Sequence, residues 1–79
     1  MKRVNSGQTV TCQGQELLVV CVHAGSGIDI TVYNSAGDEV PVDTVTATRS
    51  FTLPGHAGVR YRFVYASGSV DVSGSSLVA

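Results

Sequence analysis

The chain is a series of short stretches in which apolar and polar residues alternate. The clearest stretch covers residues 28–33, where Ile28, Ile30 and Val32 alternate with Asp29, Thr31 and Tyr33. A period of two is typical of a β-strand with one buried face. No stretch shows the periodicity of a helix, and glycines or Ser-Gly pairs interrupt the pattern at the spacing of a small sandwich or barrel. The pattern therefore predicts an all-β fold.

We expect a single domain over residues 1–79, folded as a small antiparallel β-sandwich or flattened barrel of about seven or eight strands. The predicted strands cover residues 8–13, 15–22, 28–33, 40–42, 44–53, 59–66, 70–72 and 77–78. The turn residues predict a hairpin at Gln13-Gly14, a tight hairpin connection over Asn34–Asp38 and a type II turn at Pro54-Gly55. The strand at 59–66 should direct Arg60 and Arg62 outward, with Asp29 or Asp71 as cross-strand partners.

A faint internal repeat runs through this pattern. Thr9-Val-Thr11 recurs as Thr44-Val-Thr46, His23-Ala-Gly25 as His56-Ala-Gly58, Val32-Tyr33 as Val64-Tyr65, and Ser35–Val40 more loosely as Ser67–Val72. Short Val, Thr and Gly matches also arise without duplication in β proteins. A true duplication would imply two similar halves of three or four strands each packed together.

Composition and charge narrow the classes of partner. Only 14% of the residues are charged, against roughly 25% in an average soluble domain. The net charge of −1 and the five lysines and arginines argue against nucleic acid as a main partner. The longest apolar run, residues 17–22, is far shorter than the roughly 20 residues that span a bilayer, so we expect no membrane contact. Polar residues follow the basic start where a signal peptide would be apolar, which predicts a cytoplasmic chain or one packaged there into a larger particle.

No residue pattern specifies a reaction, so we expect no enzyme, no catalytic residues, no metal site and no cofactor. Neither the histidines nor the cysteines have the spacing of a metal site, and the Gly-Ser segments lack the following helix that phosphate binding requires. The scattered carboxylates do not form a calcium loop. Cys12 and Cys21 should be reduced, buried thiols, since a disulfide between them would not fit the predicted hairpin.

The segment from Leu17 to Val22 is the best functional clue. It is apolar on both faces, so either it runs centrally between two layers or its second face meets another subunit. Little material exists for three layers in a chain of 79 residues, which favours subunit contact. With the apolar residues near the chain end, the interface candidates are Leu17, Leu18, Val19, Val20, Cys21, Val22, Leu77 and Val78.

A short β chain rich in Val, Ser, Thr and Gly, with an Ile30-Thr-Val-Tyr-Asn-Ser-Ala-Gly-Asp38 hairpin, resembles the small virion proteins of tailed bacteriophages. These include capsid decoration, head-fibre and tail-associated proteins. The resemblance is one of style over the whole chain and transfers no site residues. It implies a structural protein of a virion, assembled in the host cytoplasm, whose partners are copies of itself, a larger shell or tail protein, or both.

The alternative hypothesis is a glycan-binding or adhesion module. Its candidate ligand contacts are Tyr33, Arg60 and Arg62, because exposed aromatic rings stack on sugars and arginines bind acidic groups.

Overall fold

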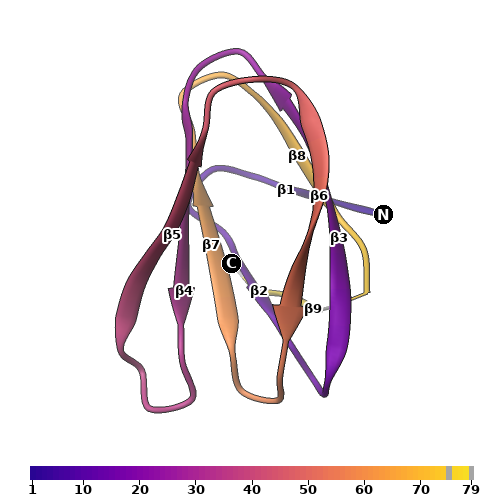
Figure 1. Cartoon of the computed structure of the whole chain (residues 1–79), viewed down its shortest axis with the longest axis vertical. Helices are drawn as coiled ribbons and strands as arrows, with labels where there is room; N and C mark the ends of the chain where they lie inside the picture. The colour runs from indigo at the N-terminus through magenta and orange to yellow at the C-terminus, as the bar shows by residue number, and fades with distance from the viewer. Residues whose placement is uncertain (75, 79) are drawn as a thin grey trace.

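A computed structural model describes residues 1–74 and 76–78, and these form two antiparallel sheets packed face to face. Sheet A contains, in spatial order, β1 (Lys2–Val4), β8 (Gly68–Val72), β3 (Glu16–Ala24) and β6 (Arg49–Gly55). Sheet B contains β5 (Glu39–Val45), β4 (Ile28–Tyr33), β7 (Arg60–Val64), β2 (Thr9–Thr11) and β9 (Ser76–Val78). In Figure 1, β4, β5 and β7 of sheet B stand at the left, and β3 and β6 of sheet A stand at the right. The predicted small antiparallel β-sandwich is confirmed.

The core lies between the two sheets and is made of alternate residues from both. Phe63, Leu18, Ile28 and Ile30 are its largest fully buried side chains. The described part of the chain contributes no buried charged residue to it. The described residues also include no helix long and apolar enough to span a bilayer.

Two predicted strand connections are wrong. The pattern placed residues 8–13 and 15–22 in one hairpin, but β2 lies in sheet B and β3 in sheet A, so the chain between them crosses from sheet to sheet. The stretch 44–53 was expected to be one strand, but it breaks at residues 46–48, where the chain passes from β5 to β6. Val45 before the break and Leu53 after it are both buried, and both are odd-numbered. The alternation in the sequence therefore shows no change at the break.

The Asn34–Asp38 hairpin is confirmed, whereas the Pro54-Gly55 turn is not. The Asn34 side chain accepts hydrogen bonds from the backbone N–H groups of Ala36 and Asp38, and Gly37 takes the positive φ that the turn requires. Pro54 and Gly55 instead end β6, and the chain turns at residues 56–58, where Gly58 has φ of 85°.

The strand registers show an approximate two-fold relation between two halves of the sandwich. Val19 lies opposite Thr52 in the β3–β6 pair, and Ile30 lies opposite Phe63 in the β4–β7 pair. In each pair the opposed residues are 33 positions apart, which is also the separation of the two His-Ala-Gly segments. A two-fold axis through an antiparallel pair places the residue at the axis opposite its own equivalent in this way.

The two-fold relation extends to the outer strands of sheet B. Val10 of β2 lies opposite Tyr61, and Val45 of β5 lies opposite Ile28, as the Thr-Val-Thr and His-Ala-Gly repeats require. The units β2–β3–β4 and β5–β6–β7 are therefore the two similar halves. The loose match of Ser35–Val40 with Ser67–Val72 has no counterpart in the fold, because β5 pairs in sheet B and β8 in sheet A.

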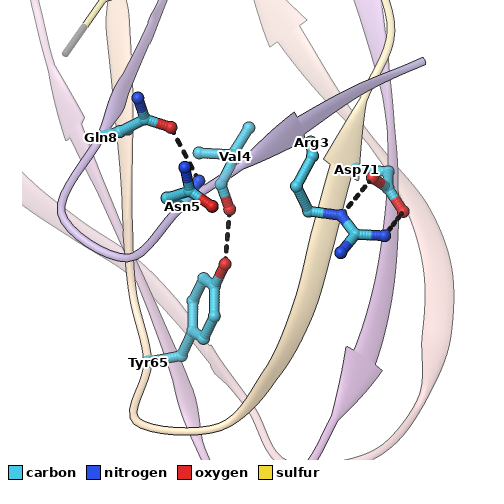
Figure 2. Close-up of polar contacts among 6 residues, drawn as sticks. All are labelled: Arg3, Val4, Asn5, Gln8, Tyr65 and Asp71. Atoms are coloured by element: carbon cyan, nitrogen blue, oxygen red, sulfur yellow. Dashed lines mark hydrogen bonds and ion pairs between the residues drawn. The ribbon is translucent and has the colours of Figure 1, made fainter.

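Two tyrosine hydroxyls connect the sheets. Tyr65, which follows β7, donates a hydrogen bond to the Val4 carbonyl of β1 at 2.5 Å (Figure 2). Tyr61 of β7 donates one to the Pro54 carbonyl of β6, also at 2.5 Å. Burial raises the pKa of the Tyr61 phenol, and the neighbouring Cys12 raises it further. Each hydroxyl thus satisfies a backbone acceptor of the opposite sheet.

Candidate interaction surfaces

The outer face of β3 carries exposed apolar side chains. Leu17 is 64% exposed and Val19 is 40% exposed, and Cys21 is partly exposed beside them. Leu17 lies opposite Pro54 of β6 in the strand register, which adds a fourth exposed apolar residue. We call these four residues the β3 outer strip. Pro54 was not among the predicted interface residues, because the sequence pattern predicts a turn at that position.

Three of the predicted interface residues belong to the core instead. Leu18, Val20 and Val22 are at most 3% exposed and pack between the sheets, so they cannot contact another molecule. The sequence could not separate them from their neighbours, because apolar residues occupy both faces of the strand. For Leu77 and Val78 the structure places the backbone in β9, paired with β2, and their side chains lie outside the described part of the molecule.

A hollow of about 450 Å³ continues the β3 outer strip at one end of the sheet. It is lined by Gln15, Glu16, Leu17, Pro54, Gly55 and His56. Leu17 and Pro54 supply its apolar surface, and Glu16 and His56 its polar groups. An apolar side chain of a partner could therefore enter the sheet face at this end.

The rest of the outer face of sheet A has little net charge. Its described ion pair joins Arg3 Nε to Asp71 Oδ1 at 2.7 Å, across the β1–β8 pair (Figure 2). The hydrogen bond and charge of Asp71 raise the pKa of the Arg3 guanidinium. Ser50 and Thr52 of β6 face outward on the same side, and Ser50 donates a hydrogen bond to Cys21 Sγ at 3.4 Å. The face therefore combines hydroxyl groups, one neutralised ion pair and the β3 outer strip.

On sheet B the three candidate ligand contacts come together. The guanidinium carbons of Arg60 and Arg62 lie 5.3 and 5.4 Å from the centroid of the Tyr33 ring, within reach of a cation–π interaction. Tyr33 lies directly opposite Arg60 in the β4–β7 pair. The β4–β7 pairing, which no local pattern specifies, places the three side chains together.

The predicted carboxylate partners of these arginines are wrong. Asp71 binds Arg3, and Asp29 accepts a hydrogen bond from the Thr44 hydroxyl at 2.9 Å. Arg62 instead contacts Glu39, with Nη2 at 3.4 Å from Oε1. Strand β5 brings Glu39 beside Tyr33, a position that the sequence pattern did not identify.

The remaining polar residues do not converge on one point. His23 and His56 are exposed, and no group of three metal-ligating side chains occurs among the described residues. A second hollow, of about 380 Å³, includes Asp29, Glu39 and Asp43 in its lining. Each of these carboxylates already has a partner: Thr44, Arg62 and Arg49 respectively.

Neither cysteine forms a disulfide, and only one of the two thiols is buried. Cys12 is 1% exposed in the core, as expected, whereas Cys21 faces outward and is partly exposed.

Comparisons with known protein families, with curated proteins and with solved structures gave no match for this chain.

Proposed function

We propose that this chain is a non-enzymatic structural protein that self-associates through the outer face of sheet A, as a capsid decoration or tail-associated component of a phage virion. The exposure of Leu17 and Val19 on β3, an internal strand of sheet A, is the observation that carries the proposal. Contiguous apolar residues rimmed by polar ones are typical of interaction sites, whereas single exposed apolar residues are ordinary.

Burial of the β3 outer strip would supply the driving force. Each Å² of apolar surface removed from water contributes about 25 cal/mol before the costs of association are subtracted. The mixed serine and threonine hydroxyls around the strip resemble the polar rim of a protein interface. The two apolar faces of β3 had two possible explanations, a third layer over the strand or contact with another subunit. Subunit contact is the better explanation, because β3 has the core on one side and solvent on the other.

Three of the four edge strands, β5, β6 and β1, hinder strand addition and so favour association by a face. Edge strand β5 contains Pro41, and its pairing with β4 shifts register between Ile30 and Thr31; edge strand β6 contains Pro54. Edge strand β1 is three residues long and carries Lys2 and Arg3. Proline, bulges, charge and short length all hinder the pairing of an edge with another chain.

The virion setting rests on the resemblance of the sequence to small virion proteins of tailed bacteriophages. A particle assembled in the host cytoplasm would cover the strip with a neighbouring copy or with a shell or tail protein. Capsid or tail genes on both sides of the coding sequence would support this setting, and an unrelated metabolic operon would contradict it.

Sedimentation over a wide concentration range tests self-association. We expect the chain to form an oligomer that a double variant, Leu17→Lys with Val19→Lys, dissociates. Val64→Lys is the matched control, because Val64 is 41% exposed but lies on β7 of the opposite sheet, and it should leave the oligomer intact. A wild-type chain that stays monomeric throughout would contradict the proposal.

A further inference from the structure

One arginine of the sandwich has no carboxylate partner in the described part of the chain. Arg3, Arg49 and Arg62 each lie within 4 Å of a carboxylate oxygen, of Asp71, Asp43 and Glu39 respectively. Arg60 has no such contact among the described residues and is exposed. Its positive charge is therefore available to a ligand, although the chain as a whole is slightly acidic.

The Tyr33 ring positions this free guanidinium beside a second one. Arg60 and Arg62 both lie over Tyr33, and Arg62 contacts Glu39 only at 3.4 Å. The Nε atom of Arg62 is buried without a hydrogen-bond acceptor. Of the two arginines, only Arg62 has a carboxylate contact, and the unpaired guanidinium of Arg60 lies on an ordered strand. Groups held in this way lose less side-chain entropy on binding.

Threonine hydroxyls surround the pair. In the register of sheet B, Arg60 lies between Tyr33 and Thr11, and Arg62 lies between Thr31 and Thr9. These residues all belong to the outer face, because the alternate residues of the same strands form the core. Guanidinium groups bind carboxylate and sulfate oxygens, and hydroxyls exchange hydrogen bonds with the hydroxyls of a sugar.

We propose that the outer face of sheet B is a binding site for an acidic saccharide. A carboxylate or sulfate group of the saccharide binds Arg60, with Arg62 beside it, and threonine hydroxyls bind the sugar hydroxyls. The site is separate from the β3 outer strip, which lies on the opposite face of the sandwich, so it goes beyond the proposed self-association and does not depend on it.

Other anionic macromolecules fit this face less well. Nucleic acids require several phosphate contacts, whereas this face offers two arginines, one of which already contacts Glu39. Peptide interfaces depend on several apolar anchors in fitted pockets. On β7 this face exposes one apolar side chain, Val64, and the cross-strand neighbours of the two arginines are a tyrosine and threonines.

NMR titration of the uniformly ¹⁵N-labelled chain tests the site directly, because each arginine Nε–H gives its own signal. The probes are hexasaccharides of hyaluronan, which carries carboxylates, and of chondroitin sulfate, which also carries sulfates. Neutral maltohexaose and a hexaglutamate peptide are the comparison ligands. We expect an acidic hexasaccharide to shift the Arg60 and Arg62 signals saturably, with maltohexaose inactive and hexaglutamate at least tenfold weaker. The difference between the two acidic probes identifies the anionic group.

Two substitutions complete the test. Arg60→Gln should weaken binding at least tenfold, and its backbone amide spectrum reports directly whether the fold is kept. Arg49→Gln is the matched control, because Arg49 also lies over an aromatic ring, that of Phe51, but is neutralised by Asp43. It should leave binding unchanged. Absence of a saturable shift, equal binding by Arg60→Gln, or equal binding of hexaglutamate would overturn the proposal.

Discussion

At the scale of single residues, two tyrosine hydroxyls make hydrogen bonds that the apolar pattern does not predict. Tyr61 and Tyr65 both point inward from the β7 segment, and both donate to backbone carbonyls of sheet A. A buried carbonyl without a donor is unfavourable, and a net hydrogen bond contributes roughly 1 kcal/mol. The two tyrosines therefore combine core packing with a polar connection between the sheets.

The Tyr61 phenol should make the stability of the sandwich depend on alkaline pH. Its pKa is raised in the folded state, so its stabilising effect is complete below the ordinary tyrosine pKa of about 10 and is lost as pH rises through the raised value. Tyr61→Phe should lower the free energy of unfolding by about 1 kcal/mol at neutral pH and make its decline above about pH 10 shallower. Urea unfolding at a series of pH values measures both effects.

Tyr33→Phe is the control for this prediction, because Tyr33 lies on the outer face and its described contacts are with its ring. It should leave the free energy of unfolding at neutral pH unchanged. Parallel alkaline curves for Tyr61→Phe and the wild type would contradict the role assigned to Tyr61.

At the scale of elements, β3 has two apolar faces, one buried in the core and one exposed to solvent. Its inward residues fill the core, and its outward residues form most of the β3 outer strip. The registers pair Glu16–Val22 of β3 with β6 on one side and Val20–Ala24 with β8 on the other, and Ser73 bonds the Val19 backbone beyond the end of β8. The strand is therefore fixed in place, and its outward side chains are presented on a rigid surface.

Two adjacent leucines, Leu17 and Leu18, allow the two faces of β3 to be compared by substitution. Leu18→Ala should lower the free energy of unfolding by about 2–5 kcal/mol, because it leaves a cavity in the core. Leu17→Ala should change it by no more than about 0.5 kcal/mol, because Leu17 is largely exposed. Urea unfolding at a concentration that keeps the chain monomeric makes the comparison. Similar losses for the two variants would contradict the assignment of the faces.

Much of this element-level structure could be predicted from alternation, and the rest depends on contacts distant in sequence. The inward and outward phases of residues 28–33 and 59–65 were predicted and are confirmed. Alternation does not say which sheet a strand joins, so the crossing between β2 and β3 and the break at residues 46–48 were missed. The closeness of Arg62 to Glu39 and the inclusion of Pro54 in the β3 outer strip likewise depend on strand pairing.

At the scale of the whole molecule, the two halves are similar but not equivalent. Strand β8 pairs with β3, with Cys21 opposite Asp71, and no described strand occupies the matching place beside β6. The two-fold relation makes Pro54 the counterpart of Cys21. Ser73 exchanges hydrogen bonds with the Val19 backbone, so the N–H and C=O groups of Val19, and of every second residue along β3, point toward β8. Cys21 is one of these residues. Its counterpart, Pro54, has no N–H group to donate to an added strand. Pro54 therefore hinders strand addition where the symmetry would place it.

Both proposed contacts use the outer faces of the sheets. Sheet A presents the β3 outer strip, and sheet B presents the arginines beside Tyr33. The two surfaces lie on opposite sides of the sandwich, so a protein neighbour and a saccharide could bind at the same time.

The most direct test of the central claim, that the β3 outer strip is covered on self-association, is the rate of Cys21 alkylation as a function of protein concentration. Cys21 lies within the strip, and the buried Cys12 serves as an internal reference that reacts only on unfolding. We expect the rate constant for Cys21 to fall as concentration rises in the wild type, and to stay constant in the variant carrying Leu17→Lys and Val19→Lys. A wild-type rate constant that does not change with concentration would contradict the account.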